Sequence, residues 1–208
     1  MLIETVVVRS GRAPLWELHM ARMQLAAAQL GLPAPDATEP VGGSDRILRL
    51  MLGRAGTSTK FRDLGSQGPV RLATVDVLHR PYPHKTVQRA VFDQALAEAQ
   101  AVGADEPLLL ADGGFVAESA RFAVVWEDDQ GRLAAPPLAL GILPSVGRAR
   151  LHQLSGGIVE QAVERGGLDG RAVALVNAVR GVVPIASLDG TKVPQSALLE
   201  RLAERFWP

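Results

Sequence analysis

The chain has 208 residues, of which 47% are apolar, a formal net charge of zero at pH 7, and no cysteine. This length suits one compact unit or two small lobes with a sizeable core, and the balanced charge argues against a nucleic-acid binder that neutralises phosphates in bulk. Because cysteine is missing, disulfides, thiolate metal sites, iron–sulfur clusters and cysteine nucleophiles are excluded.

The apolar run that opens the chain turns polar after eight residues, which is typical neither of a signal peptide nor of a membrane span. No apolar run approaches the ~20 residues that a transmembrane helix needs. We therefore expect a cytoplasmic protein with no membrane partner, no nucleic-acid partner and no metal ligands.

The first part of the chain, residues 1–80, predicts a small lobe of mixed α and β structure. Apolar runs predict three strands, at residues 2–8, 47–52 and 70–78. The Ala-, Leu- and Met-rich stretch 15–30 predicts a helix that Gly31 ends. A polar segment at 53–68 separates the last two strands. Two prolines within residues 80–84 favour an extended connector, so we expect a second lobe over 84–208.

The second part of the chain alternates short strands with helices. A stripe of apolar residues predicts a helix over 86–102, and an amphipathic helix over 195–206 closes the chain. Strands are expected at residues 108–110, 115–117, 121–126, 173–176 and 182–186. A Gly/Pro loop at 141–147 leads into a short helix from Arg148, and the N–H groups of such a helix start bind phosphate well.

Lysine occurs only at Lys60, Lys85 and Lys192, so chemistry that needs a primary amine has three candidates. In a helix, Lys85 and Arg89 would share a face, and the guanidinium would lower the pKa of the amine and make it more nucleophilic. The alternative is an ordinary exposed lysine beside a helix.

Two further groups of charged residues attract attention. Glu118 lies in a segment that is otherwise typical of a buried strand, so its carboxylate needs a partner. Its role is either a structural ion pair, with Arg121 as the nearby cation, or an acceptor for a ring N–H in a pocket. His19 and Arg22 share one face of the first helix, an arrangement that is usually solvated surface.

Taken in order, these segments resemble the class IV aminotransferase family, the fold-type IV pyridoxal phosphate enzymes. The motifs that carry the resemblance are Ile3-Glu4-Thr5, His19-Met-Ala-Arg22, the lysine Lys85, Gly103-Ala-Asp-Glu106 with Phe115-Val-Ala-Glu118, Gly141-Ile-Leu-Pro-Ser-Val-Gly-Arg148, and Asn177-Ala-Val-Arg-Gly-Val-Val-Pro184. Together they extend over nearly the whole chain.

The resemblance implies an α+β, two-lobed fold of the D-amino-acid aminotransferase type. It has a small N-terminal α/β sandwich lobe and a larger C-terminal cofactor-binding lobe with a β-barrel-like sheet. It further implies pyridoxal 5'-phosphate as cofactor, a small anionic amine as substrate, and a homodimer. Lys85 would be the catalytic residue. The implied cofactor-binding residues are Arg22, Lys85, Glu118, Val146, Gly147 and Ala178.

Within the family, the run His84-Lys85-Thr-Val-Gln-Arg89 looks most like the aminodeoxychorismate lyases, which release pyruvate and 4-aminobenzoate and belong to folate biosynthesis. The alternative is an amino-acid transaminase of the branched-chain or D-amino-acid type. Branched-chain aminotransferases usually have Tyr at the position of Ala90. Three arginines are candidate carboxylate clamps and remain unranked: Arg62, Arg89 and Arg121.

Four positions depart from the family pattern and lose a polar side chain or a glycine. These positions are Ala123, Ala135, Ser145 and Ala178. A lost hydrogen bond typically costs ~1 kcal/mol, so phosphate binding would depend on Arg22 and on the N–H groups of Val146 and Gly147. A catalytically silent member of the family is therefore a third hypothesis.

Overall fold

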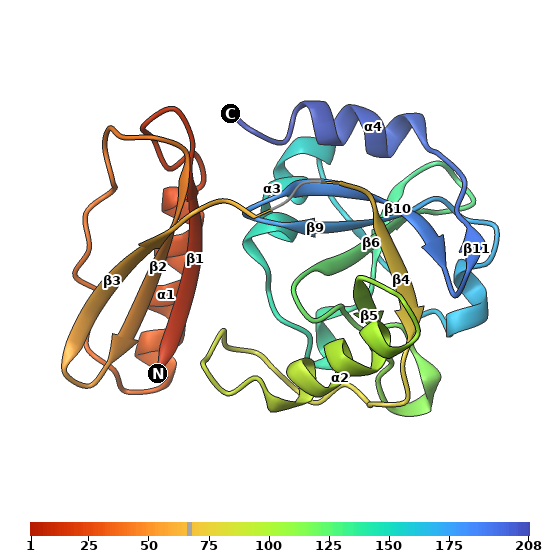
Figure 1. The fold of residues 1–208 in the computed structure, drawn as a ribbon, viewed down its shortest axis with the longest axis horizontal. Helices are drawn as coiled ribbons and strands as arrows, with labels where there is room; N and C mark the ends of the chain where they lie inside the picture. Colours follow the sequence, from red (N-terminus) through yellow and green to blue (C-terminus); the bar gives the residue numbers. More distant parts are fainter. Residues whose placement is uncertain (66–67) are drawn as a thin grey trace. The chain divides into compact units, whose positions relative to one another are not determined.

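A computed structural model describes residues 1–65 and 68–208, and the chain forms two compact units (Figure 1). Unit 1 comprises Met1–Gln67, His84–Gln88 and Trp207–Pro208, and unit 2 comprises Gly68–Pro83 and Arg89–Phe206. This division differs from the expected lobes, because the strand after Gly68 joins the sheet of unit 2. In turn, the residues around Lys85 pair with the first strand of unit 1.

Unit 1 is a three-stranded antiparallel sheet with one helix packed on it. The strand order is β1-β2-β3, and the bounds are β1 Leu2–Val8, β2 Arg46–Gly53 and β3 Gly56–Arg62. Helix α1, Trp16–Gln29, packs its buried side chains against this sheet. The sequence did not predict β3, because its run of exposed polar residues lacks the alternation that marks a strand.

Strand alternation decides where the carboxylate of Glu4 lies. Leu2, Val6 and Val8 pack into the core beneath α1, and side chains two residues apart share one face of a strand. Glu4 therefore lies on the same helix-facing side, where it is 1% exposed. A carboxylate in that position needs partners from the helix.

Unit 2 is built on an eight-stranded sheet of mixed direction. The order is β5-β4-β10-β9-β6-β7-β8, with β11 paired to β10. The strands are β4 Val70–Thr74, β5 Glu106–Leu108, β6 Ala123–Glu127, β7 Leu133–Ala135, β8 Val159–Glu160, β9 Val173–Asn177, β10 Gly181–Leu188 and β11 Thr191–Lys192. Each expected strand of this part is matched by a strand or, at residues 115–117, by isolated bridges.

The two ends of this path of strands approach each other through residues 115–118. Leu109 N–H donates to the backbone carbonyl of Glu118, and Ala117 N–H donates to the backbone carbonyl of Leu109, at 3.0 Å each. On the other side, Val116 N–H donates to the carbonyl of Val163, just beyond β8, at 2.9 Å. The sheet thereby curls toward closure, which agrees with the expected barrel-like lobe.

Three α-helices cover the sheet of unit 2: α2 Ala90–Ala101, α3 Val146–Ser155 and α4 Ala197–Glu204 (Figure 1). Short 3₁₀ helices lie at η1 Asp112–Gly114, η2 Leu138–Leu140 and η3 Arg165–Leu168. Helix α3 packs on β9, α4 packs on β10 and β6, and α2 packs on β5 and β4. None of the helices in the described residues is long and apolar enough to cross a membrane.

Candidate active site

The predicted site residues fall in both units. Unit 1 holds Arg22, Arg62 and Lys85, whereas unit 2 holds Arg89, Glu118, Arg121, Val146, Gly147 and Ala178. Each unit gathers its own group of these residues.

Lys85 lies on extended backbone beside β1. Its carbonyl accepts a hydrogen bond from Ile3 N–H at 2.9 Å, and its neighbour Thr86 forms an antiparallel bridge with Leu2. The predicted helix over 86–102 therefore begins only at Ala90, and the expectation that Lys85 and Arg89 share a helical face is wrong. The sheet of unit 1 fixes the backbone of the lysine instead.

Glu4, the residue after Ile3 in β1, forms a buried polar cluster with His19 and Arg22 of α1. Nδ1 of His19 lies 2.7 Å from Glu4 Oε2, and Arg22 donates to both oxygens of Glu4, from Nε at 2.8 Å and from Nη2 at 2.5 Å. The pair His19 and Arg22 is thus not solvated surface, because the i, i+3 spacing places both residues over the buried carboxylate.

Charge and burial act in opposite directions on this cluster. Burial by itself would raise the pKa of Glu4, but the Arg22 guanidinium and the hydrogen bond from His19 outweigh it and lower that pKa to about 2. Burial also lowers the pKa of His19, and the charges of Arg22 and Lys85 act in the same direction against the opposing effect of Glu4. Lys85 therefore acts electrostatically on this cluster.

In unit 2, Glu118 is 5% exposed and is held by a histidine and a backbone amide. Its Oε1 lies 2.8 Å from His79 Nε2 and accepts from Leu143 N–H at 3.2 Å. Arg121, the cation expected beside it, is instead bonded to the buried Glu106. The structural alternative with Arg121 is therefore wrong, and His79 holds the carboxylate in its place.

The start of α3 lies against the turn that follows β9. A Cβ on Gly147 would stand 2.9 Å from Val176 Cγ2 and 3.0 Å from Asn177 Cα, so only glycine permits this approach. Asn177 Oδ1 accepts from the N–H groups of the second and third following residues, at 2.9 and 2.8 Å, and fixes the turn that contains Ala178. The N–H groups of Val146 and Gly147 belong to the first helical turn, where no helical carbonyl can reach them.

Ser145, one of the departures from the family pattern, has a structural use. It is the N-cap of α3, and its hydroxyl accepts from Arg148 N–H at 3.0 Å. Ala123 and Ala135 are buried in β6 and β7.

The three candidate clamps differ in their surroundings. Arg89 donates to the carbonyl of Ala120 and stacks on Phe92, with 4.9 Å from its Cζ to the ring centroid. Arg121 is held by Glu106. Within residues 1–65 and 68–208, no carboxylate lies within ion-pair distance of the exposed Arg62, at the end of β3.

The sequence model of the amino-transferase class IV family matches residues 61–188. The chain belongs to this family. This membership confirms the predicted family and makes the protein a pyridoxal phosphate-dependent enzyme. A comparison with curated protein sequences finds no match.

Several solved structures have the same fold. A candidate 4-amino-4-deoxychorismate lyase from Legionella pneumophila is 24% identical with a TM-score of 0.82, over 97% of this chain and 88% of that chain. A candidate amino-acid aminotransferase from Mesorhizobium loti is 26% identical with a TM-score of 0.78, over 89% and 98%. A hypothetical aminotransferase from Mycobacterium tuberculosis, solved in a pyridoxal phosphate-bound form, is 22% identical with a TM-score of 0.84, over 99% and 87%. These likenesses confirm the predicted fold class.

The donor set of unit 2 fits pyridoxal phosphate. Leu143 N–H is bonded to Glu118, and α3 begins three residues later at Val146, so these two backbone nitrogens lie within about 10 Å of each other. A pyridine ring with a phosphomethyl arm can span such a distance. The carboxylate suits a ring N–H, and helix-start N–H groups suit a phosphate.

Sequence reasoning missed His79 as the partner of Glu118. A single histidine 39 residues upstream of its carboxylate carries no spacing signal. The prolines that follow it in the connector gave the only hint that this segment has a fixed shape.

Proposed function

We propose that this class IV enzyme is an aminodeoxychorismate lyase-type enzyme, which eliminates pyruvate from 4-amino-4-deoxychorismate and leaves 4-aminobenzoate. The observation that carries the proposal is the segment His84–Gln88 with the following Arg89. Its backbone pairs with β1, the Thr86 hydroxyl accepts from Gln88 N–H at 3.2 Å, and Arg89 holds the carbonyl of Ala120. The four residues that define the lyase-like motif H-K-T-x-x-R, at positions 84, 85, 86 and 89, thus lie in a segment that these hydrogen bonds hold in place.

Glu118 and the start of α3 would hold the cofactor. Glu118 would accept a hydrogen bond from the pyridine N–H, and His79 would keep the carboxylate in place. The N–H groups of Val146, Gly147 and Ala178 would bind the phosphate. When bound, pyridoxal phosphate supplies an electron sink for the bond that breaks.

Lys85 would hold the cofactor covalently and then act as the base. Its amine would take the proton from the amine-bearing carbon of the substrate, the step common to the lyase and to a transaminase. Loss of pyruvate then makes the ring of the product aromatic, which favours elimination. Arg62, which is exposed and has no carboxylate within ion-pair distance among the described residues, would bind a carboxylate of the substrate.

An amino-acid transaminase is the second candidate. The matching family sequence model is that of the aminotransferases, and the Mesorhizobium loti protein, at 26% identity, bears an aminotransferase name. Against a branched-chain type stands Ala90, the exposed first residue of α2, which has no hydroxyl group.

The deciding experiment combines a cofactor assay with two activity assays on wild type, Lys85→Ala and Lys192→Ala. Lys192 is exposed in β11 and serves as the matched control. We expect borohydride to fix the cofactor to Lys85, as located by peptide mass spectrometry. We also expect release of 4-aminobenzoate and pyruvate when no keto acid is added as amino acceptor. Both the fixation of the cofactor and this activity should be lost in Lys85→Ala alone.

The other outcomes are equally informative. Stoichiometric consumption of a keto acid, with no 4-aminobenzoate, would replace the lyase by the transaminase. Cofactor fixed to Lys85 without either activity would favour the silent family member. Unchanged activity in Lys85→Ala would contradict the assignment of the catalytic lysine itself.

A further inference from the structure

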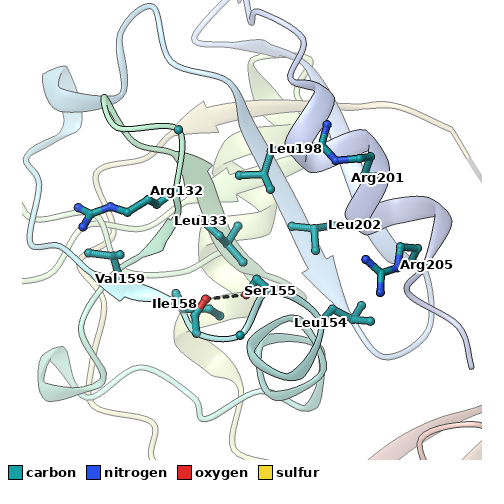
Figure 2. A pocket seen from close by; sticks show the side chains of 13 residues that line it. Arg132, Leu133, Leu154, Ser155, Ile158, Val159, Leu198, Arg201, Leu202 and Arg205 are labelled. Atoms are coloured by element: carbon teal, nitrogen blue, oxygen red, sulfur yellow. Dashed lines mark hydrogen bonds between the residues drawn. The ribbon is translucent and has the colours of Figure 1, made fainter.

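A pocket lies between the last helix and the far end of α3 (Figure 2). Its volume is about 500 Å³, within the range of small-molecule sites. The lining residues come from three places in unit 2: residues 131–133 around the start of β7, residues 154–159 from the end of α3 to β8, and Leu198, Arg201 and Leu202 of α4 with its C-cap Arg205. Because α3 has ten residues, this pocket lies about 15 Å from the Val146 end of the helix.

The floor of the pocket is apolar. Figure 2 shows Leu198 and Leu202 of α4 directed toward Leu133, Leu154 and Ile158. Leu133 and Leu202 are buried, whereas the other three are only partly covered. A ligand with an apolar body would cover these partly exposed side chains, and burying their apolar surface would stabilise the complex.

The rim of the pocket is positively charged. Arg201 of α4 and Arg205, the C-cap of this helix, are four residues apart, on the side of the helix that also carries Leu198 and Leu202. Among the described residues, neither guanidinium has a carboxylate within ion-pair distance, and no acidic side chain lines the pocket. The third arginine, Arg132, is already paired with Asp128 at 2.8 Å.

We propose that this pocket binds a small amphipathic anion, with an apolar body on the leucine floor and a carboxylate or similar group on Arg201 and Arg205. Two adjacent cations without counter-ions repel each other, and a carboxylate relieves that repulsion through charge-assisted hydrogen bonds. A hollow lined on several sides suits a compact ligand, and a cationic rim disfavours amines. The proposal does not depend on the reaction at the cofactor.

Octanoate is a suitable probe, because it joins a short alkyl chain to one carboxylate. We would titrate the cofactor-saturated enzyme with anilinonaphthalene sulfonate, a fluorescent amphipathic anion, and displace it with octanoate, octylammonium or 1-octanol. Octanoate is expected to compete at least tenfold better than the other two. Hydrogen exchange should show new protection at 154–159 and in α4.

Variants test both halves of the pocket. The double change Arg201→Gln and Arg205→Gln should weaken octanoate binding tenfold or more, and Ile158→Trp should weaken it by filling the hollow. The matched control, Arg12→Gln with Arg54→Gln, removes two exposed arginines of unit 1 and should leave binding unchanged.

Three results would overturn the proposal. Octylammonium could compete as well as octanoate, or the Arg201/Arg205 double variant could bind octanoate as tightly as the Arg12/Arg54 control. The third such result is the absence of octanoate binding at about 10 mM, roughly the Kd of a weak site. If the Arg201 and Arg205 variant loses its fold, as judged by circular dichroism, Ile158→Trp and the competition series still decide.

Discussion

The buried cluster around Glu4 makes a quantitative prediction about acid stability. The change Glu4→Gln keeps the size of the side chain but removes its negative charge, and it leaves the Arg22 guanidinium over a neutral amide. The pKa of Glu4 lies below its unfolded value, so its ionisation stabilises unit 1 above pH 4.5. That stabilisation is lost as the pH falls toward about 2.

The size of the effect follows from the pKa. A fall from 4.5 to about 2 corresponds to roughly 3 kcal/mol of folding free energy at pH 7. This agrees with the ~3–5 kcal/mol that the removal of one partner from a buried ion pair typically costs. The stability difference between wild type and Glu4→Gln should therefore narrow by about 2 kcal/mol between pH 7 and pH 3.

Urea unfolding at several pH values measures this difference, and hydrogen exchange of the α1 amides reports on unit 1 alone. Glu17→Gln is the matched control, because Glu17 lies exposed in the first turn of the same helix. Its effect should stay within a few tenths of a kcal/mol. A difference between wild type and Glu4→Gln that is constant from pH 7 to pH 3 would refute the reasoning.

Three further predictions concern unit 2. Gly147→Ala should weaken cofactor binding tenfold or more and destabilise the fold by about 1–3 kcal/mol, because its Cβ would meet the Asn177 backbone at 3.0 Å. Equilibrium dialysis and thermal melts would compare it with the control Gly166→Ala, whose Cβ meets nothing closer than 4.0 Å. Equal effects of the two substitutions would contradict the prediction. His79→Leu removes the hydrogen-bond donor to the Glu118 carboxylate and should lower the cofactor affinity about tenfold, whereas His79→Gln should lower it less. Spectroscopic titrations that give the same affinity for both variants would contradict the role of His79 in holding Glu118. Burial raises the pKa of Glu106 despite its bonds to a serine and an arginine, so its ionisation opposes folding above pH 4.5. Glu106→Gln should therefore cost clearly less stability at pH 7 than Glu4→Gln in the same urea assay. An equal cost would refute this comparison.

Local patterns in the sequence predicted most of the elements that carry the candidate site. The apolar run at 2–8 is β1 to the residue, and the Ala-rich helix and the helix after the Gly/Pro loop differ from α1 and α3 by two residues or fewer at each start. These signals are local, because apolar periodicity, caps and glycine act within a few residues. The polar β3 and the late start of α2 escaped them, since both depend on pairing with another strand.

The family motifs also identified the site residues to be tested, among them Lys85 and Glu118. The motifs did not predict the partner of Glu118. The nearest cation in sequence, Arg121, is bonded to Glu106, and the actual neighbour of Glu118 is His79.

The sequence by itself therefore determined the family and the cofactor, and it predicted which residues form the site, because these inferences depend on residue types at fixed spacing. Only the tertiary structure decided which charges are buried and which groups neutralise them. Glu4 meets His19 and Arg22 because strand alternation turns it under α1, and α3 can approach Asn177 because position 147 has no side chain. Burial and pairing arise from contacts between distant segments, and these contacts shift the pKa values of buried groups such as Glu4 and Glu106.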